Sequence, residues 1–286
     1  MNTQFWVIQA FNGISYGALL FLLGSGLSLI FGVMRIVNLA HGAYFLWGGY
    51  IALSVIWVTG SWALSLPVAA LAVAILGLGM ERIFLRPLGF DPLRQVLLTV
   101  GFAYLFQQAA LDIWGGDNMD INPAAIFNNS VVIGGIYFPL YRVFMIAMAL
   151  AIGVGLWLAM EKTRMGAAVR ATVDDAEMAR GVGIDTNRIS MFIFALGAFL
   201  AALGGVIGGA FLGIYPGLDF EVLPLAFAVV IIGGMGSLGG AAIGALIVGL
   251  ADNFGKALFP EISYFTLYAP MVLILAVKPT GLFGRE

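Results

Sequence analysis

Residues 222–252 read VLPLAFAVVIIGGMGSLGGAAIGALIVGLAD, an apolar stretch that a run of glycines divides in two. A helix needs about 20 residues to cross the hydrocarbon core of a bilayer, so this stretch is too long for one crossing. The dividing run, GGMGSLGG at 233–240, breaks the helix, and a broken helix at membrane depth is tolerated only where its backbone is buried in protein or lines a cavity. We interpret 222–252 as a re-entrant hairpin that turns near 233–240; a single broken crossing is the alternative.

The composition of the whole chain indicates a membrane protein. Of its 286 residues, 62% are hydrophobic and 10% are charged, against roughly 45–50% and about 25% in soluble domains. The mean hydropathy is +1.03, and the alternating pattern of a β-barrel is absent. We expect an all-α, polytopic membrane helix bundle that forms one domain over 1–286. Its about eight apolar segments are 5–32, 38–59, 61–81, 95–114, 139–160, 190–213, 222–252 and 262–278.

Lysine and arginine residues gather in alternate loops between these segments. Because such loops face the cytoplasm, the N-terminus is expected outside, and a hairpin at 222–252 returns the C-terminus to the cytoplasm. The residues that set this orientation are Arg35, Arg82, Arg86, Arg94, Lys162, Arg164, Arg170, Arg180, Arg188, Lys278 and Arg285.

Several functional classes are disfavoured by what the chain contains. It has no cysteine and one histidine, so we expect no metal site. Its net charge of −2 argues against a nucleic-acid partner. No phosphate-binding loop of the Gly-x-x-x-x-Gly-Lys-Ser/Thr type occurs. Glu81, Asp112 and Glu161 lie at segment ends without an evident acid or nucleophile partner, so we expect no catalytic residue.

Two series of small residues recur at every fourth position, which places each series on one helix face. Such faces let backbones approach closely inside lipid. They serve either static helix packing or a sliding contact in a moving transporter. The series are Gly197, Ala201, Gly205 and Gly209, and Ser237, Ala241, Ala245 and Gly249.

The longest polar stretch, 161–189, is predicted to contain a short helix at the membrane surface. Asp174 followed by Glu177 resembles a capping box that starts a helix over 175–180. Gly181 and Gly183 supply its end. Ala176 and Ala179 are small enough for a close partner. The alternative is a solvated loop whose basic residues only mark the cytoplasmic side.

Three motifs resemble one protein family. RATVDDAEMARGVGIDTNR at 170–188 is similar to the coupling loop of permeases from bacterial ABC importers of the branched-chain amino acid type. NLAHGAY at 38–44 resembles an early signature of that family, and GGMGSLGGAAIG at 233–244 resembles its late glycine-rich segment. The matches lie from the first spans to the last, so the resemblance covers essentially the whole chain.

The resemblance implies an inner-membrane permease subunit of an ATP-driven importer that carries branched-chain or related amino acids. Its partners would be a second permease subunit, two cytoplasmic ATPases that bind ATP-Mg, a periplasmic binding protein and membrane lipid; this chain itself would bind no cofactor. The residues that would enter the ATPase cleft are Asp174, Asp175, Ala176, Glu177, Ala179, Gly181, Gly183 and Ile184.

Other functions remain open at this point. The same machine could carry urea, short amides or another small polar solute. A stand-alone channel or ion-coupled carrier is the alternative from a different class, and it predicts transport without ATP.

Polar residues in apolar spans tend to face a cavity or another helix. Gly236 and Ser237 at the predicted turn could offer helix ends to a zwitterionic substrate, or the glycines serve packing alone. Asn38 and His41 are further pathway candidates, although His41 could instead be a proton-linked switch, or cap or pack the start of the second segment.

Arg142 and Lys256 are positive charges at the predicted outer face. They could pair with acidic residues of a binding protein and set its register. Anchoring of the helix ends at the interface is the alternative.

Overall fold

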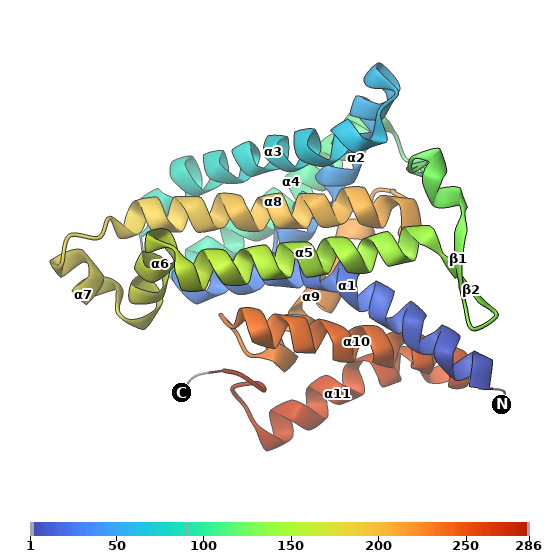
Figure 1. Ribbon diagram of the computed structural model, residues 1–286. Helices are drawn as coiled ribbons and strands as arrows, with labels where there is room; N and C mark the ends of the chain where they lie inside the picture. Colours follow the sequence, from blue (N-terminus) through green and yellow to red (C-terminus); the bar gives the residue numbers. More distant parts are fainter. Residues whose placement is uncertain (1–2, 90, 285–286) are drawn as a thin grey trace.

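The computed structural model describes residues 3–89 and 91–284, and these residues form a helical bundle (Figure 1). Seven of its helices are long and apolar enough to cross a membrane, which confirms the predicted all-helical membrane fold. The elements are α1 Thr3–Met34, α2 His41–Thr59, α3 Trp62–Met80, η1 Glu81–Leu85, η2 Arg86–Leu88, α4 Pro92–Trp114, η3 Ala125–Asn128, β1 Ser130–Ile133, β2 Ile136–Pro139, α5 Leu140–Lys162, α6 Arg164–Asp174, α7 Ala176–Gly181, α8 Thr186–Leu212, α9 Leu218–Gly233, α10 Leu238–Leu258, η4 Pro260–Ile262 and α11 Ser263–Val277.

The bundle has two distinct ends. Helices α1, α3, α5 and α8 run along its length, with the antiparallel β1–β2 pair at one end and α6 and α7 at the other (Figure 1). We call these the hairpin end and the α7 end. The chain starts α1 at the hairpin end, and the segment after α11 lies toward the α7 end (Figure 1). Arg285 lies outside the described residues.

Helix α1 is packed against α8 and α10 through glycine. A Cβ atom on Gly17 would stand 2.7 Å from the carbonyl oxygen of Ala245 on α10. A Cβ on Gly26 would stand 2.6 Å from the carbonyl oxygen of Gly197 on α8. Backbone therefore touches backbone at these crossings. Gly197 and Ala245 belong to the two predicted small-residue series, which here act in helix packing.

Helix α2 meets α8 in the same way. A Cβ on Gly48 would stand 2.7 Å from the carbonyl carbon of Ala202. A Cβ on Gly205 would stand 2.8 Å from the carbonyl carbon of Phe45. Large apolar side chains fill the space around these contacts, with Tyr44 and Phe45 fully buried. Helix α8 thus joins α1 and α2 into the core of the bundle.

The predicted break in 222–252 is present. Helix α9 ends at Gly233, α10 begins at Leu238, and the two arms lie antiparallel because Gly233 packs on Gly240 and Gly244 packs on the carbonyl group of Val229. The hairpin is thus confirmed in form.

Contacts with α1 and α6 place the turn of this hairpin. Gly236 packs on Gly32, two residues before the end of α1. Leu238 packs in a cluster with Val169 of α6. The turn therefore lies at the α7 end. Its position is fixed by the C-terminal segment, where the amides of Leu282 and Phe283 donate to the last carbonyl groups of α9.

A second chain reversal, which the apolar pattern did not reveal, precedes α2. Arg35 is exposed and adopts a left-handed conformation with φ of 53° at the end of α1. Residues 36–40 then run back into the bundle without helical structure. The ring of His41, the first residue of α2, contacts the carbonyl oxygen of Leu23. Leu23 lies 11 residues before the end of α1, or about 16 Å along the helix axis, so α2 begins inside the bundle rather than at residue 38 near the surface.

Replacing Gly17 by alanine tests the close contact of α1 with α10. The added methyl group meets backbone atoms that cannot rotate away, and overpacking of this kind costs about 1–3 kcal/mol. We expect the thermal midpoint of the purified chain to fall by roughly 5 °C.

Gly101→Ala is the matched control, because a Cβ at this exposed position on α4 meets nothing within 4 Å. Alanine is also the better helix former, so the midpoint should stay the same or rise slightly. Equal losses in both variants would contradict the packing role of Gly17.

Candidate functional site

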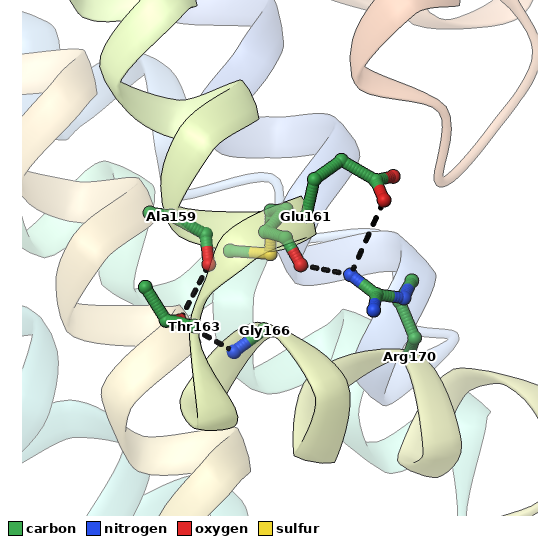
Figure 2. A network of polar contacts seen from close by, with 6 residues as sticks. Ala159, Glu161, Thr163, Gly166 and Arg170 are labelled. Carbon is green, nitrogen blue, oxygen red and sulfur yellow. Dashed lines mark hydrogen bonds and ion pairs between the residues drawn. The ribbon is translucent and has the colours of Figure 1, made fainter.

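The α7 end carries a helical element, α6 with α7, that is joined to α5 by a sharp corner. The hydroxyl group of Thr163 accepts a hydrogen bond from the amide of Gly166 at 3.0 Å and so caps α6 (Figure 2). The same hydroxyl donates to the carbonyl oxygen of Ala159. A side chain at Gly166 would collide with the carbonyl groups of Ala159 and Met160. The corner therefore requires glycine at this position.

Arg170 closes this corner from the α6 side. Its guanidinium group donates to the carbonyl oxygen of Met160 and lies 3.9 Å from a carboxylate oxygen of Glu161 (Figure 2). The C-terminal carbonyl groups of a helix favour a cation, so this contact stabilises the end of α5. Helix α6 lies within the polar stretch 161–189, where the sequence predicts only the short helix that follows it.

The cap of α7 is Asp175, not Asp174 as the sequence predicted. The Asp175 carboxylate accepts hydrogen bonds from the amides of Glu177 and Met178, both at 2.9 Å. Asp174 is the last residue of α6. The helix accordingly runs from Ala176 to Gly181 rather than over 175–180.

The connection from α7 to α8 is equally well defined. Gly183 has φ of 89°, which reverses the chain after α7, in agreement with its predicted role. The side chain of Arg180 donates to the hydroxyl group of Thr186 at 2.7 Å. Asp185 caps α8 through the amide of Arg188. These two hydrogen bonds connect α7 to the start of α8 and define the start of α8.

The outward surface of this element differs from the predicted one. Ala179 is 3% exposed, and Ile184 is half-buried. Met178 and Val182 are instead 66% and 72% exposed, and Glu177 is exposed beside them. Two apolar side chains within a polar loop are the sequence signal for this surface.

The reversal before α2 places polar groups inside the bundle. The Asn38 side-chain oxygen accepts from the amide of Ala40 at 3.1 Å, and the amide of Leu39 donates to the hydroxyl group of Thr99 on α4. His41 is fully buried, with its Nε2 atom 3.0 Å from the carbonyl oxygen of Leu23. His41 packs and does not cap, because Ala40 stands at the cap position without a side-chain hydrogen bond.

The start of α9 meets the start of α2 at this place. Gly42 packs directly on the carbonyl oxygen of Asp219, so two helix N-termini converge within the bundle. Asp219 is 2% exposed. Among the described residues, one carboxylate oxygen of Asp219, Nδ1 of His41 and the Asn38 amide nitrogen have no hydrogen-bond partner. We call Asn38, His41 and Asp219 the interior polar centre.

Sequence reasoning missed Asp219 because the apolar run starts at 222, whereas α9 begins at Leu218. Glu81 was also assigned to a segment end. It lies within the span that continues α3, where it is 2% exposed in the π-helical turn η1. Turns of this kind are frequent at functional sites.

The structure separates the four predicted pathway residues into two places. Asn38 and His41 belong to the interior polar centre. Gly236 is exposed at the α7 end, and the hydroxyl group of Ser237 caps α10 through the amide of Gly240 at 3.0 Å. The turn therefore does not contribute helix ends to the interior polar centre.

Arg142 and Lys256 both lie near the hairpin end, in different surroundings. The Arg142 guanidinium group donates to the side chain of Asn12 at 2.6 Å and stands over the ring of Phe211. Lys256 donates to the buried carboxylate of Asp252 at 2.8 Å, although its side chain is 64% exposed. Lys256 thus offers more surface to another protein than Arg142 does.

Among the residues of 3–89 and 91–284, no three histidine, aspartate or glutamate side chains gather where they could hold a metal ion. Long apolar helices, a polar centre at two interior helix starts, and a firmly attached helical element outside the bundle together define an integral membrane protein.

The chain belongs to the family described as the permease component of the branched-chain amino acid transport system, whose family model matches residues 9–275. It is 31% identical to the high-affinity branched-chain amino acid transport system permease protein LivH of Escherichia coli, over 100% of this chain and 98% of the relative. It is 29% identical to the high-affinity branched-chain amino acid transport system permease protein BraD of Pseudomonas aeruginosa, over 97% of this chain and 95% of the relative. The ribose import permease protein RbsC of Haemophilus influenzae is 29% identical over 46% of this chain. No solved structure matches.

Replacing Asp175 by alanine tests the assignment of the α7 cap. The amides of Glu177 and Met178 lose their acceptor, and an N-cap is worth about 1 kcal/mol. We expect hydrogen exchange at these two amides to become about fivefold faster, as measured by exchange coupled to mass spectrometry. Asp174→Ala serves as the control and should leave both rates unchanged; the reverse result would restore Asp174 as the cap.

Proposed function

We propose that this chain is the membrane subunit of an ATP-driven importer and that separate ATPase subunits contact it at α7. The observation that carries this proposal is the geometry of α7, a helix that stands outside the bundle and is tied to both neighbouring membrane helices. Arg170 holds its support α6 against α5, and Arg180 holds α7 to α8. Met178 and Val182 give it an apolar outer surface of the kind that protein interfaces bury at their centre.

The α7 end is proposed to face the cytoplasm and the N-terminus the opposite side. The basic loops of the chain support this orientation. Arg86, which follows α3, contacts Met191 near the start of α8, so the second basic loop lies at the same end as α6 and α7. The binding protein would then meet the hairpin end, where Lys256 is exposed.

A movement of α7 has a direct route to the interior polar centre. Helix α8 is capped by Asp185 beside α7. Further along, Ala202 of α8 is in backbone contact with Gly48 of α2. Helix α2 in turn carries His41 at its start. Packed interfaces shift between discrete arrangements rather than deform continuously, so this chain of contacts supports alternating access driven from α7.

The proposed cargo is a branched-chain or related amino acid. The relatives named for branched-chain amino acid transport align over nearly the whole chain, whereas the ribose permease aligns over less than half. The interior polar centre suits a zwitterion, because helix N-termini favour a carboxylate and the Asp219 carboxylate favours an ammonium group. A second permease subunit, two ATPases with ATP-Mg and a periplasmic binding protein complete the proposed machine.

The complex purified through this chain from its native membrane and reconstituted in liposomes tests the proposal. We expect leucine uptake that requires both ATP inside the α7-side compartment and the binding protein. Uptake by the isolated chain without ATP would instead establish a channel or ion-coupled carrier, and ATP-driven uptake of urea without leucine would change the cargo.

The double substitution Met178→Asp and Val182→Asp tests α7 as the ATPase contact. Two charges placed in an apolar interface should lower ATP-driven uptake by at least about tenfold, since central interface residues are commonly worth 2 kcal/mol or more. Uptake and co-purification of the ATPases are measured together.

Val132→Asp is the matched control, because Val132 is 54% exposed on β1 at the opposite end. It should keep ATPase association, which is the readout compared between the two variants. Normal uptake in the α7 double variant would remove α7 from the coupling route.

Asp219→Asn distinguishes an amino acid cargo from a neutral amide. Hydrogen bonds to charged groups contribute about 1.5–3 kcal/mol, so we expect the KM for leucine uptake to rise at least about tenfold while ATPase association is retained. Asp112→Asn, at an exposed residue that accepts from Gln108, should change neither. An unchanged KM in Asp219→Asn would exclude Asp219 from contact with the ammonium group.

A further inference from the structure

An apolar groove opens between α1, α5 and α10, on the outside of the bundle and away from the interior polar centre. It encloses a cavity of about 440 Å³. Glycine, alanine and larger apolar side chains line it. The lining includes Phe21 of α1, Ala149, Gly153 and Trp157 of α5, and Gly239 and Leu246 of α10.

The length and position of the groove match one leaflet of a bilayer. Along α5 it extends from Trp157 back to Ile146, which is 11 residues or about 16 Å of helix. That is about half of the ~30 Å hydrocarbon core. Trp157 is 55% exposed and lies little more than one turn from the end of α5, where tryptophan marks the membrane interface. The groove therefore runs inward from the interface at the α7 end.

A pair of opposite charges stands at the mouth of the groove. Glu161 follows Trp157 by one helical turn on the same face of α5, and Arg170 of α6 lies beside it (Figure 2). Both side chains are about half exposed, and the closest nitrogen and oxygen atoms are 3.9 Å apart. The contact to the Met160 carbonyl group fixes the Arg170 guanidinium group in place, and the exposed parts of the Arg170 and Glu161 side chains can reach a third group.

We propose that this groove binds one phosphatidylethanolamine molecule from the leaflet at the α7 end. One acyl chain fills the groove, the phosphate accepts from Arg170, and the primary ammonium group donates to Glu161. The charge pattern of the mouth selects this head group. Phosphatidylglycerol has no cation for Glu161, and the trimethylammonium group of phosphatidylcholine has no N–H donor.

The head group must supply the selectivity, because the acyl chain gains no hydrophobic free energy on leaving one hydrocarbon medium for another. Any lipid tail can fill the void and make dispersion contacts with its lining. The two charges at the mouth are the part of the site that differs between lipids. The site is independent of the proposed transport function, since the isolated chain contains all of it.

Quenching of tryptophan fluorescence by lipids with brominated acyl chains tests the site directly. Trp157 lines the groove, and the chain has 6 tryptophan residues, so the signal of Trp157 is the difference between the native chain and Trp157→Phe. In phosphatidylcholine bilayers we expect brominated phosphatidylethanolamine to quench this component about fivefold more strongly than brominated phosphatidylcholine or phosphatidylglycerol. A fivefold preference is the most that an exposed ion pair commonly contributes.

Charge variants separate head-group recognition from filling of a void. Glu161→Gln and Arg170→Gln should each abolish the preference, so that brominated phosphatidylethanolamine and brominated phosphatidylcholine quench Trp157 about equally. Lys162→Gln removes a neighbouring exposed charge that lies off the groove face and should keep the preference. Equal quenching by all three lipids in the native chain, or stronger quenching by phosphatidylglycerol, would overturn the proposal.

Two glycine variants test the groove itself. A Cβ at Gly239, in the lining, and one at Gly155, on α5 outside the lining, each meet nothing within 4 Å, so both positions accept a side chain. Gly239→Leu should fill the groove and abolish the preference, whereas Gly155→Leu should retain it. Retention in Gly239→Leu would show that the lipid binds elsewhere.

Discussion

Backbone contact between helices is the constraint on which the rest of this structure depends. Inside a bilayer, lipid tails are as apolar as leucine, so helices associate through close packing and hydrogen bonds rather than through a hydrophobic drive. Gly17 and Gly26 let α1 touch α10 and α8 at the backbone, and Gly48 lets α2 touch α8. A side chain at any of these crossings would separate two helices and lose dispersion contacts along their whole shared length.

The same tight core makes the irregular chain before α2 tolerable. Backbone without helical hydrogen bonds is very costly at membrane depth unless protein satisfies it. Here Asn38 and Thr99 provide acceptors for two of the amides, and both of these side chains are fully buried. A carboxylate oxygen of Asp219 and a ring nitrogen of His41 have no hydrogen-bond partner. Both atoms lie where the starts of α2 and α9 meet, so a bound molecule there could use their hydrogen-bonding capacity.

The sequence predicted which helices form better than it predicted where they begin and turn within the bundle. Hydrophobic runs and the glycines at 233–240 identified the spans and the hairpin, because both signals are local. The position of the turn beside Gly32 depends on packing with α1 and was not readable from the run itself. Helix α6 has no long apolar run, and the reversal at Arg35 rests on one backbone conformation. The burial of Ala179 follows from how α7 lies against α6 and the start of α8, which only the assembled chain defines.

The coupling role that we propose for α6 and α7 requires an element that is both firm and exposed, and different residues meet these two demands. Short side chains make the element firm, because Thr163, Asp175 and Asp185 each cap a helix start. These caps leave the outer surface of α7 uncovered. Exposure is left to longer apolar side chains such as Met178. Because the caps fix the backbone before any partner arrives, little conformational entropy remains to be lost on docking, and a push on the outer surface is not absorbed by a flexible loop.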